Sequence, residues 1–274
     1  MGFRYAGIKG VKPENVEVEA VALYSDVAHA GAFHCSNELL NRLQSNITWS
    51  AKSNFVDIPT DCPQRDERMG WTGDINVFAP TALYNFELSR FLEKWLRDVK
   101  AEQRPGGGIP NTVPVQGYGF PATMPEMAVD WWGDACVNVP WALYEATGSV
   151  DILRTMYPTM QKYVKACRFW AGFGIGKHRY IWHTPSVLHF GDWVAPDVPK
   201  MSQWQRAANT PPRPAFFTPA AGWLRLHASS VRIRTPPFTR IEPQGGRCLL
   251  QRIYGRQRQG KGRVPDRLMC CHCT

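Results

Sequence analysis

The chain has 274 residues, of which 44% are hydrophobic and 20% charged, and its formal net charge is +9. This composition excludes a fully disordered or collagen-like chain, and no run approaches the roughly 18 apolar residues of a membrane span. Residues 206–274 hold 13 basic and two acidic residues, whereas residues 1–205 hold 19 basic and 21 acidic ones. The main body is therefore slightly acidic, which argues against nucleic acid as its partner.

The first residues alternate apolar and polar side chains, as a half-buried strand does. Val16 and Val18 alternate with Glu17 and Glu19, and residues 3–8 form a second run that suits a strand. We expect a strand in each run. Residues 1–4 carry no apolar signal core, so the sequence predicts a cytoplasmic protein, unless Met1 is an internal start.

Two helices are expected next. Ser36 is expected to cap the first, and the second is expected from Thr81 to about Gln103. Both have apolar residues at helical spacing. Their expected buried faces are Leu39, Leu40, Leu43 and Ile47 in the first helix, and Leu83, Phe86, Phe91, Trp95 and Leu96 in the second.

Two further helices follow a long loop. One is expected from Ala135 to Thr147, stopped by Gly148, and the other over residues 151–170. Pro158 lies inside the latter and predicts a kink or a break. Its expected inward residues are Leu153, Met156, Met160, Val164 and Cys167.

Long segments rich in Pro, Gly and Trp separate these helices, at residues 54–74, 104–132 and 172–204. Loops of this length in a compact domain are either functional or disordered. Their aromatic content argues against disorder, so we expect a site built at one end of a helical scaffold. With no secretion signal, the scattered cysteines are expected to be free thiols: Cys35, Cys62, Cys136 and Cys167.

The last part of the chain, residues 206–274, is rich in Arg and Pro and has no helical or strand period. One interpretation is a basic tail that binds nucleic acid. A second is a zinc site in the cluster at residues 270–273, although no second pair of ligands lies upstream at normal spacing. We favour a third, that this irregular tail is sequence read out of frame, which translation of the other two frames beyond codon 205 would test.

The segment with most chemistry runs from residue 54 to residue 74. Four carboxylates lie within 14 residues of it, beside two arginines and a tryptophan. Acids bind sugar hydroxyls, an indole stacks on the apolar face of a sugar ring, and a carboxyl with a raised pKa can protonate a departing glycosidic oxygen. The simpler alternative is a solvated loop with surface ion pairs. The four carboxylates are Asp61, Asp66, Glu67 and Asp74.

The run Thr60-Asp61-Cys62-Pro63-Gln64-Arg65-Asp66-Glu67-Arg68, followed by Gly70-Trp71-Thr72-Gly73-Asp74, closely resembles the signature of bacterial α-L-rhamnosidases, glycoside hydrolase family 78. Further segments resemble family landmarks in the family's order, among them Trp132-Gly133-Asp134-Ala135 and Gly191-Asp192-Trp193. The similarity covers roughly residues 1–204. It implies a mainly α fold, a partial (α/α)6 barrel over residues 34–205, preceded by the remnant of a β-sandwich in residues 1–33.

The resemblance also implies an enzyme that releases terminal α-L-rhamnose from rhamnosides with inversion. By this resemblance Glu67 matches the general acid, with Asp66 held in reserve. Positions that match sugar contacts or aromatic walls are Asp61, Arg65, Trp71, Asp74, Trp132 and Trp193. Taken alone, Trp132 and Trp193 are equally well explained as packing residues, and Arg65 as the counter-ion of Asp61 or Asp66. No cofactor, metal, nucleic acid or membrane is expected, and nothing points to an oligomeric state.

An inverting glycosidase needs a second carboxylate to activate water. In the family this general base is a Glu far downstream, and after residue 205 this chain offers only Glu242 and Asp266, in sequence unlike the family. We therefore expect the chain to lack the base and to be inactive, with exposed apolar helix faces. The alternatives are a non-catalytic carbohydrate-binding fragment and a different (α/α)6 glycosidase.

Overall fold

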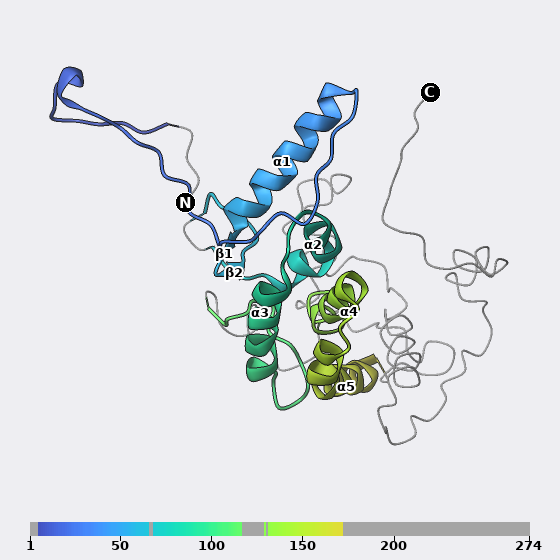
Figure 1. Ribbon diagram of the computed structural model, residues 1–274. Helices are drawn as coiled ribbons and strands as arrows, with labels where there is room; N and C mark the ends of the chain where they lie inside the picture. The colour runs from blue at the N-terminus through green and yellow to red at the C-terminus, as the bar shows by residue number, and fades with distance from the viewer. Residues whose placement is uncertain (1–4, 66–67, 117–128, 130, 172–274) are drawn as a thin grey trace, which may run out of the picture. The chain divides into compact units, whose positions relative to one another are not determined.

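The computed structural model describes residues 5–65, 68–116, 129 and 131–171, and over these residues the chain is mainly helical (Figure 1). A two-stranded antiparallel hairpin pairs Phe55 with Pro59 and Val56 with Ile58. The expected loop at 172–204 and the tail at 206–274 lie outside the described residues. In chain order the elements are a 3-10 helix (Pro13–Asn15), α1 (Glu38–Asn54), β1 (Phe55–Val56), β2 (Ile58–Pro59), α2 (Thr72–Asn85), α3 (Ser89–Glu102), α4 (Ala135–Thr147) and α5 (Asp151–Ala171).

Helix α1 begins one residue later than the sequence suggested, and Ser36 is not its cap. Asn37 has the extended backbone of an N-cap, and its side chain accepts a hydrogen bond from the backbone N–H of Leu39 at 2.9 Å. Asn and Ser are similarly good N-caps, so composition alone did not separate the two neighbours. Asn41 fixes the choice, because its side chain binds both the N–H and the carbonyl of Cys35 and so turns the chain into the helix.

The single helix expected from Thr81 to Gln103 is wrong: the structure has two helices, and the first begins at Thr72. Residues 28–30 cause the interruption. Ala30 N–H donates to the carbonyl of Asn85 at 3.0 Å, and Glu87 N–H donates to the carbonyl of Ala28 at 2.9 Å. This pairing takes the backbone at residues 85–87 out of helix, because a carbonyl and an N–H that bond another segment favour an extended conformation.

The third expected helix is confirmed at both ends, and α5 covers the fourth. Gly148 adopts the left-handed conformation with φ of 73°, and its N–H donates to the carbonyl of Tyr144 at 2.7 Å, which closes α4. Pro158 does not break α5 into two helices. All five residues expected to point inward from α5 are buried. No helix in the described ranges is long and apolar enough to cross a membrane.

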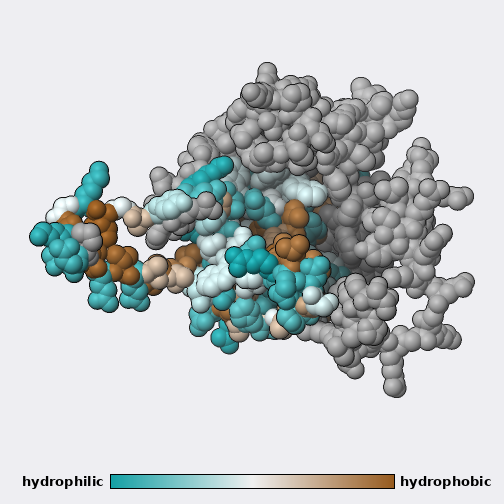
Figure 2. All heavy atoms as spheres, turned by 90° about the horizontal axis from the view of Figure 1, so that it is seen from above, coloured by the Kyte–Doolittle hydropathy of each residue, from teal (hydrophilic) through white to brown (hydrophobic). Residues whose placement is uncertain are grey.

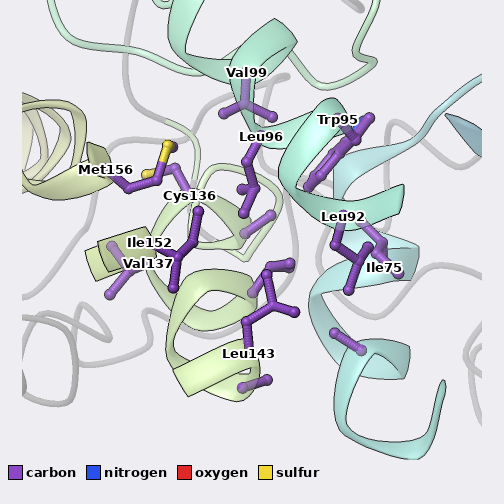
Figure 3. Packing of buried hydrophobic residues seen from close by; sticks show 14 of the residues in the cluster. Ile75, Leu92, Trp95, Leu96, Val99, Cys136, Val137, Leu143, Ile152 and Met156 are labelled. Atoms are coloured by element: carbon purple, nitrogen blue, oxygen red, sulfur yellow. The ribbon is translucent and has the colours of Figure 1, made fainter. Parts of the chain in front are cut away.

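The core lies where α4 packs against α2, α3 and α5. Figure 3 shows Leu92 of α3 beside Ile75 of α2, and Leu96 directed toward the side chains of α4. Trp95 is fully buried, and its indole N–H donates to the carbonyl of Val113 at 3.0 Å. The same core includes Ile75 of α2, Val137 and Leu143 of α4, and Ile152 and Met156 of α5.

The strands expected near the N-terminus are wrong for the described residues, since residues 5–8 and 16–21 are not in strands. An extended run becomes a strand only when another backbone pairs with it, and in the described residues these runs have no such pairing. Val18 and Val21 are therefore exposed. The face of α1 expected to be buried is also largely exposed, at Leu39, Leu40 and Leu43, and apolar side chains are visible on the surface of the described part (Figure 2).

Candidate active site

The acidic segment that follows α1 is folded back on itself by backbone pairing. Thr60 donates its N–H to the carbonyl of Asn54 at 3.0 Å, immediately after the β1–β2 hairpin. Asp61 N–H then donates to the carbonyl of Met69 at 3.1 Å, which closes a loop over residues 61–69. Arg68 holds this loop to the end of α1, because its guanidinium donates to the carbonyl of Ser53 at 2.6 Å.

The start of α2 is fixed by a second segment, residues 111–113. Thr72 N–H donates to the carbonyl of Asn111, and Val113 N–H donates to the carbonyl of Gly70, both at 2.9 Å. Trp71, between them, pairs with Thr112 in an antiparallel bridge. Only glycine fits at position 70, because a Cβ there would overlap the carbonyl oxygen of Val113. The residues of the motif that precede α2 are thus held on the backbone of a distant loop.

Asp74 lies in the first turn of α2 and has an altered acidity. The pKa of Asp74 is raised from 3.8 to about 6, first by burial and then by the negative charge of Asp61, while the hydrogen bond to its own backbone N–H acts in the opposite direction. The side chain reaches solvent, so the effect of burial comes from the surrounding protein rather than from complete removal of water. A helix N-terminus ordinarily favours a carboxylate. Here the partial loss of hydration and the like charge outweigh that preference.

The neighbouring thiol and guanidinium belong to the same electrostatic group. The pKa of Cys62 is raised to about 11, first by burial and then by a hydrogen bond to Asp61 and its charge, whereas Arg65 opposes the increase. Cys62 therefore stays protonated at neutral pH and is no nucleophile. The guanidinium of Arg65 is thus close enough to Cys62, the residue next to Asp61, to act on it electrostatically.

An aromatic cluster packs against α2 beside these charges. Trp132 is buried, and together with Val129 it forms a small cluster against which Trp71 packs. The indole of Trp132 lies over Gly73, where a Cβ would come within 2.7 Å of its ring. The motif's glycine therefore lets a tryptophan from a loop about 60 residues later lie flat on the first turn of α2.

A polar network that the sequence did not indicate holds this loop. Asn76 of α2 donates to the carbonyl of Trp131 at 2.9 Å and accepts from Asn138 of α4 at 2.9 Å. Trp131 N–H lies 3.3 Å from a carboxylate oxygen of Asp134, and the Tyr163 hydroxyl lies 3.0 Å from the other. Burial, and then the charge of Asp134, raise the pKa of Tyr163 well above its usual range, so this hydroxyl keeps its proton and donates. The only sequence signal was Asp134 in a family landmark.

This arrangement is suited to binding a polyhydroxylated ring. It offers two carboxylates, of which one changes protonation near pH 6, a guanidinium and two packed indoles. In the described residues there is no group of three His, Cys, Asp or Glu side chains that could hold a metal ion. The four cysteines of the described part are free thiols, as expected.

Residues 28–229 match the family model of the bacterial alpha-L-rhamnosidase 6 hairpin glycosidase domain. The chain belongs to this family. An alpha-L-rhamnosidase of Formosa agariphila is 41% identical over 199 residues, which cover 71% of this chain and 20% of that protein. An alpha-L-rhamnosidase of Streptomyces avermitilis is 38% identical over 208 residues, which cover 73% of this chain and 18% of that protein. The chain thus spans about a fifth of the length of these curated relatives.

Solved α-L-rhamnosidase structures share the fold. The crystal structure of the Streptomyces avermitilis enzyme complexed with L-rhamnose superposes with a TM-score of 0.60 at 34% identity, over 76% of this chain and 18% of that one. The α-L-rhamnosidase structure from Dictyoglumus thermophilum superposes with a TM-score of 0.62 at 32% identity, over 76% of this chain and 22% of that one. The expected fold class is confirmed: the described helices are part of a six-hairpin glycosidase domain.

For this α-L-rhamnosidase-family chain, the structure brings together five of the expected site residues around the start of α2. Asp61 and Arg65 lie on the loop before the helix, Trp71 and Asp74 lie at its beginning, and Trp132 packs on Gly73. The side chain of Trp132 is 7% exposed. Outside the described residues lie Asp66, Glu67 and Trp193.

Proposed function

We propose that this chain carries the acid-bearing part of a glycosidase site that acts on terminal α-L-rhamnose with inversion. The observation that carries the proposal is the juxtaposition of Asp61 and Asp74, two electrostatically coupled carboxylates, with Trp71 in a family-matching segment. The family relationship and the L-rhamnose complex of the Streptomyces avermitilis relative support rhamnosides as ligands.

In this proposal Glu67 is the general acid, which protonates the glycosidic oxygen as the bond to the departing group breaks. Its assignment is supported by its place in the family-matching run of residues 60–74. Asp74 contributes a carboxyl that is part protonated near pH 6, so it can donate to one sugar hydroxyl or accept from another. Arg65 supplies a cation that limits the repulsion between the acids.

Hydrolysis with inversion also requires a base that activates water about 6.5–9.5 Å from the acid. We propose that the 274 residues do not supply this base, because only Glu242 and Asp266 follow residue 205 and neither lies in sequence like the family's. By itself the chain then binds rhamnosides without turning them over. Binding without turnover is what the second candidate function, a non-catalytic carbohydrate-binding fragment, would show.

Two measurements on the purified chain test these proposals. Titration with L-rhamnose, followed by tryptophan fluorescence, should show saturable binding, since Trp71 and Trp132 lie beside the carboxylates. An assay with an aryl α-L-rhamnoside should show no turnover. Turnover at the rate of an intact relative would contradict the missing base and leave the glycosidase proposal standing, whereas failure to bind would contradict the sugar site.

If turnover is observed, two variants identify the acid. Glu67→Gln should abolish hydrolysis of rhamnosides with poor leaving groups and spare those with good leaving groups, because only a poor leaving group needs its proton. Asp66→Asn is the matched control, with a neighbouring carboxylate replaced by its amide. The reverse pattern would assign the acid to Asp66.

A further inference from the structure

The acidic motif contains two arginines with different surroundings. Arg65 is exposed, whereas Arg68 is half-buried and its guanidinium donates to the backbone carbonyl of Ser53 at 2.6 Å. Arg65 acts through its charge, which opposes the raised pKa of Cys62. The proposed function gives Arg65 a role but none to Arg68, although Arg68 binds the backbone of a helix that lies outside the motif.

The partner of Arg68 is the last turn of α1, where the carbonyl groups of a helix have no intrahelical donors. Ser53 and Asn54 are the last two residues of α1. The carbonyl of Ser53 accepts from the guanidinium, and that of Asn54 accepts from both the N–H and the hydroxyl of Thr60, at 3.0 Å and 2.9 Å. The helix dipole also favours a cation at this end. Two residues of the motif therefore bind adjacent carbonyls of one helix end.

Asp61 lies between these two attachments. It follows Thr60 directly, and its N–H donates to the carbonyl of Met69, the residue after Arg68, at 3.1 Å. One oxygen of the Asp61 carboxylate also lies 3.5 Å from the backbone nitrogen of Met69. The side chain of Met69 is buried, which limits the movement of this residue. Thr60 and Arg68 thus hold the backbone pair of Asp61 and Met69 from both sides.

An arginine is well suited to this attachment. Its charge is permanent, and a hydrogen bond from a charged donor is roughly twice as strong as a neutral one. The bond to Ser53 engages the guanidinium with α1, whereas Asp61 is close enough to Asp74 of α2 to act on it electrostatically. Arg68 is therefore linked to the two carboxylates through the backbone of Met69 and Asp61.

We propose that Arg68 is a positioning residue: with Thr60 it holds the carboxylate of Asp61 where this group can accept a hydrogen bond from a hydroxyl of the bound sugar. The inference rests on the proposed function, which places Asp61 in the sugar site. A carboxylate that is fixed before the sugar arrives lowers the entropy cost of binding. Arg65 then limits the repulsion between the acids, and Arg68 fixes the position of one of them.

Titration of the 274-residue chain with L-rhamnose, followed by tryptophan fluorescence, measures the first consequence. Arg68→Met keeps an unbranched stem and loses the donors, so the affinity should fall about twofold to tenfold, the equivalent of one neutral hydrogen bond. Arg68→Lys should recover most of this loss, because an ammonium group can also donate to the carbonyl of Ser53. Arg154→Met is the matched control: it removes an exposed guanidinium of α5 and should leave the affinity unchanged.

A second measurement needs no ligand. NMR titration of Asp74 reports the position of Asp61, whose charge raises the pKa of Asp74. In Arg68→Met the pKa of Asp74 should fall as Asp61 moves away, although the loss of a cation by itself would raise it. In the Asp61→Asn background the same replacement should produce no such fall. If Arg68 served stability alone, both the affinity and this pKa would be unchanged in the folded variant.

An unchanged pKa of Asp74 in folded Arg68→Met overturns the positioning role, and so does a fall of equal size in the Asp61→Asn background. If Arg68→Met does not fold, Thr60→Val decides, since it removes only the hydroxyl bond of the other attachment. It should lower the affinity and the pKa of Asp74, and no change in either overturns the inference. A wild-type chain that binds no L-rhamnose overturns the proposed function instead, and the pKa of Asp74 still decides whether Arg68 positions Asp61.

Discussion

Gly73 and Trp132 lie in direct contact although they are about 60 positions apart: a Cβ on Gly73 would come within 2.7 Å of the indole ring. Gly73 belongs to the acidic motif and Trp132 to the loop before α4. Their contact joins the two segments that form the candidate site. The glycine is therefore required by a neighbour rather than by its own backbone conformation.

Gly73→Ala should destabilise the chain by about 1–3 kcal/mol, because the methyl group displaces a buried indole that has little room to move. Urea unfolding measures the loss, and L-rhamnose affinity should fall with it as the loop shifts. Gly7→Ala is the control, since a Cβ there meets nothing within 4 Å. Equal stability of the two variants would show that Trp132 does not lie on Gly73.

Asp74 should make the stability of the chain depend on pH in the acidic range. Its pKa of about 6 in the folded chain lies above the ordinary value of 3.8, so the folded state binds more protons between these two values. The contribution of Asp74 to stability is then fully present below pH 3.8 and is lost as the pH rises through about 6. Urea unfolding at pH 4 and pH 7 should show this decrease, and it should be smaller in Asp74→Asn.

Asp61→Asn tests the second cause of the shift. Removal of this neighbouring charge should lower the pKa of Asp74 toward its ordinary value without restoring it, because burial is the larger cause. NMR titration of the Asp74 carboxyl group measures the change. A pKa of Asp74 that is the same in Asp61→Asn and in the wild type would contradict the coupling of the two carboxylates.

Tyr163→Phe should cost about 1–3 kcal/mol, because the variant leaves a carboxylate and a buried carbonyl without their hydrogen-bond donor. The hydroxyl lies 2.8 Å from the carbonyl of Val129 and 3.0 Å from Asp134, while the ring that packs on Gly133 is kept. Chemical denaturation measures the cost. Tyr84→Phe, at a side chain that is 81% exposed, should change stability little, and a similar cost at both positions would contradict the role of the network.

The sequence predicted most reliably those features that depend on residues close together in the chain. Apolar periodicity and Gly148 located α4, and the residues of the motif at 61–74 are close in the chain, so their grouping needed no knowledge of the fold. The break between α2 and α3 was missed because it depends on backbone pairing with residues 28–30. Periodicity does not reveal a partner that lies more than 50 residues away.

The support of the candidate site was missed for the same reason. Asn76 binds Trp131 across 55 positions and Asn138 across 62, and asparagine is too common on helices for either residue to attract notice. The prediction of strands near the N-terminus was wrong for a different reason. Their pattern suits a strand, but a pattern does not supply the second backbone to which a strand must bond.

Neighbouring residues at the start of α1 offer the sharpest comparison of sequence and structure. Asn37→Ala should destabilise α1 by about 1 kcal/mol, because the side chain of Asn37 accepts a hydrogen bond from the N–H of Leu39 at 2.9 Å. Ser36→Ala should cost much less, although Ser36 is an equally good cap by composition. Circular dichroism during thermal unfolding distinguishes the two variants. A larger loss in Ser36→Ala would return the cap to Ser36 and move the start of the helix back by one residue.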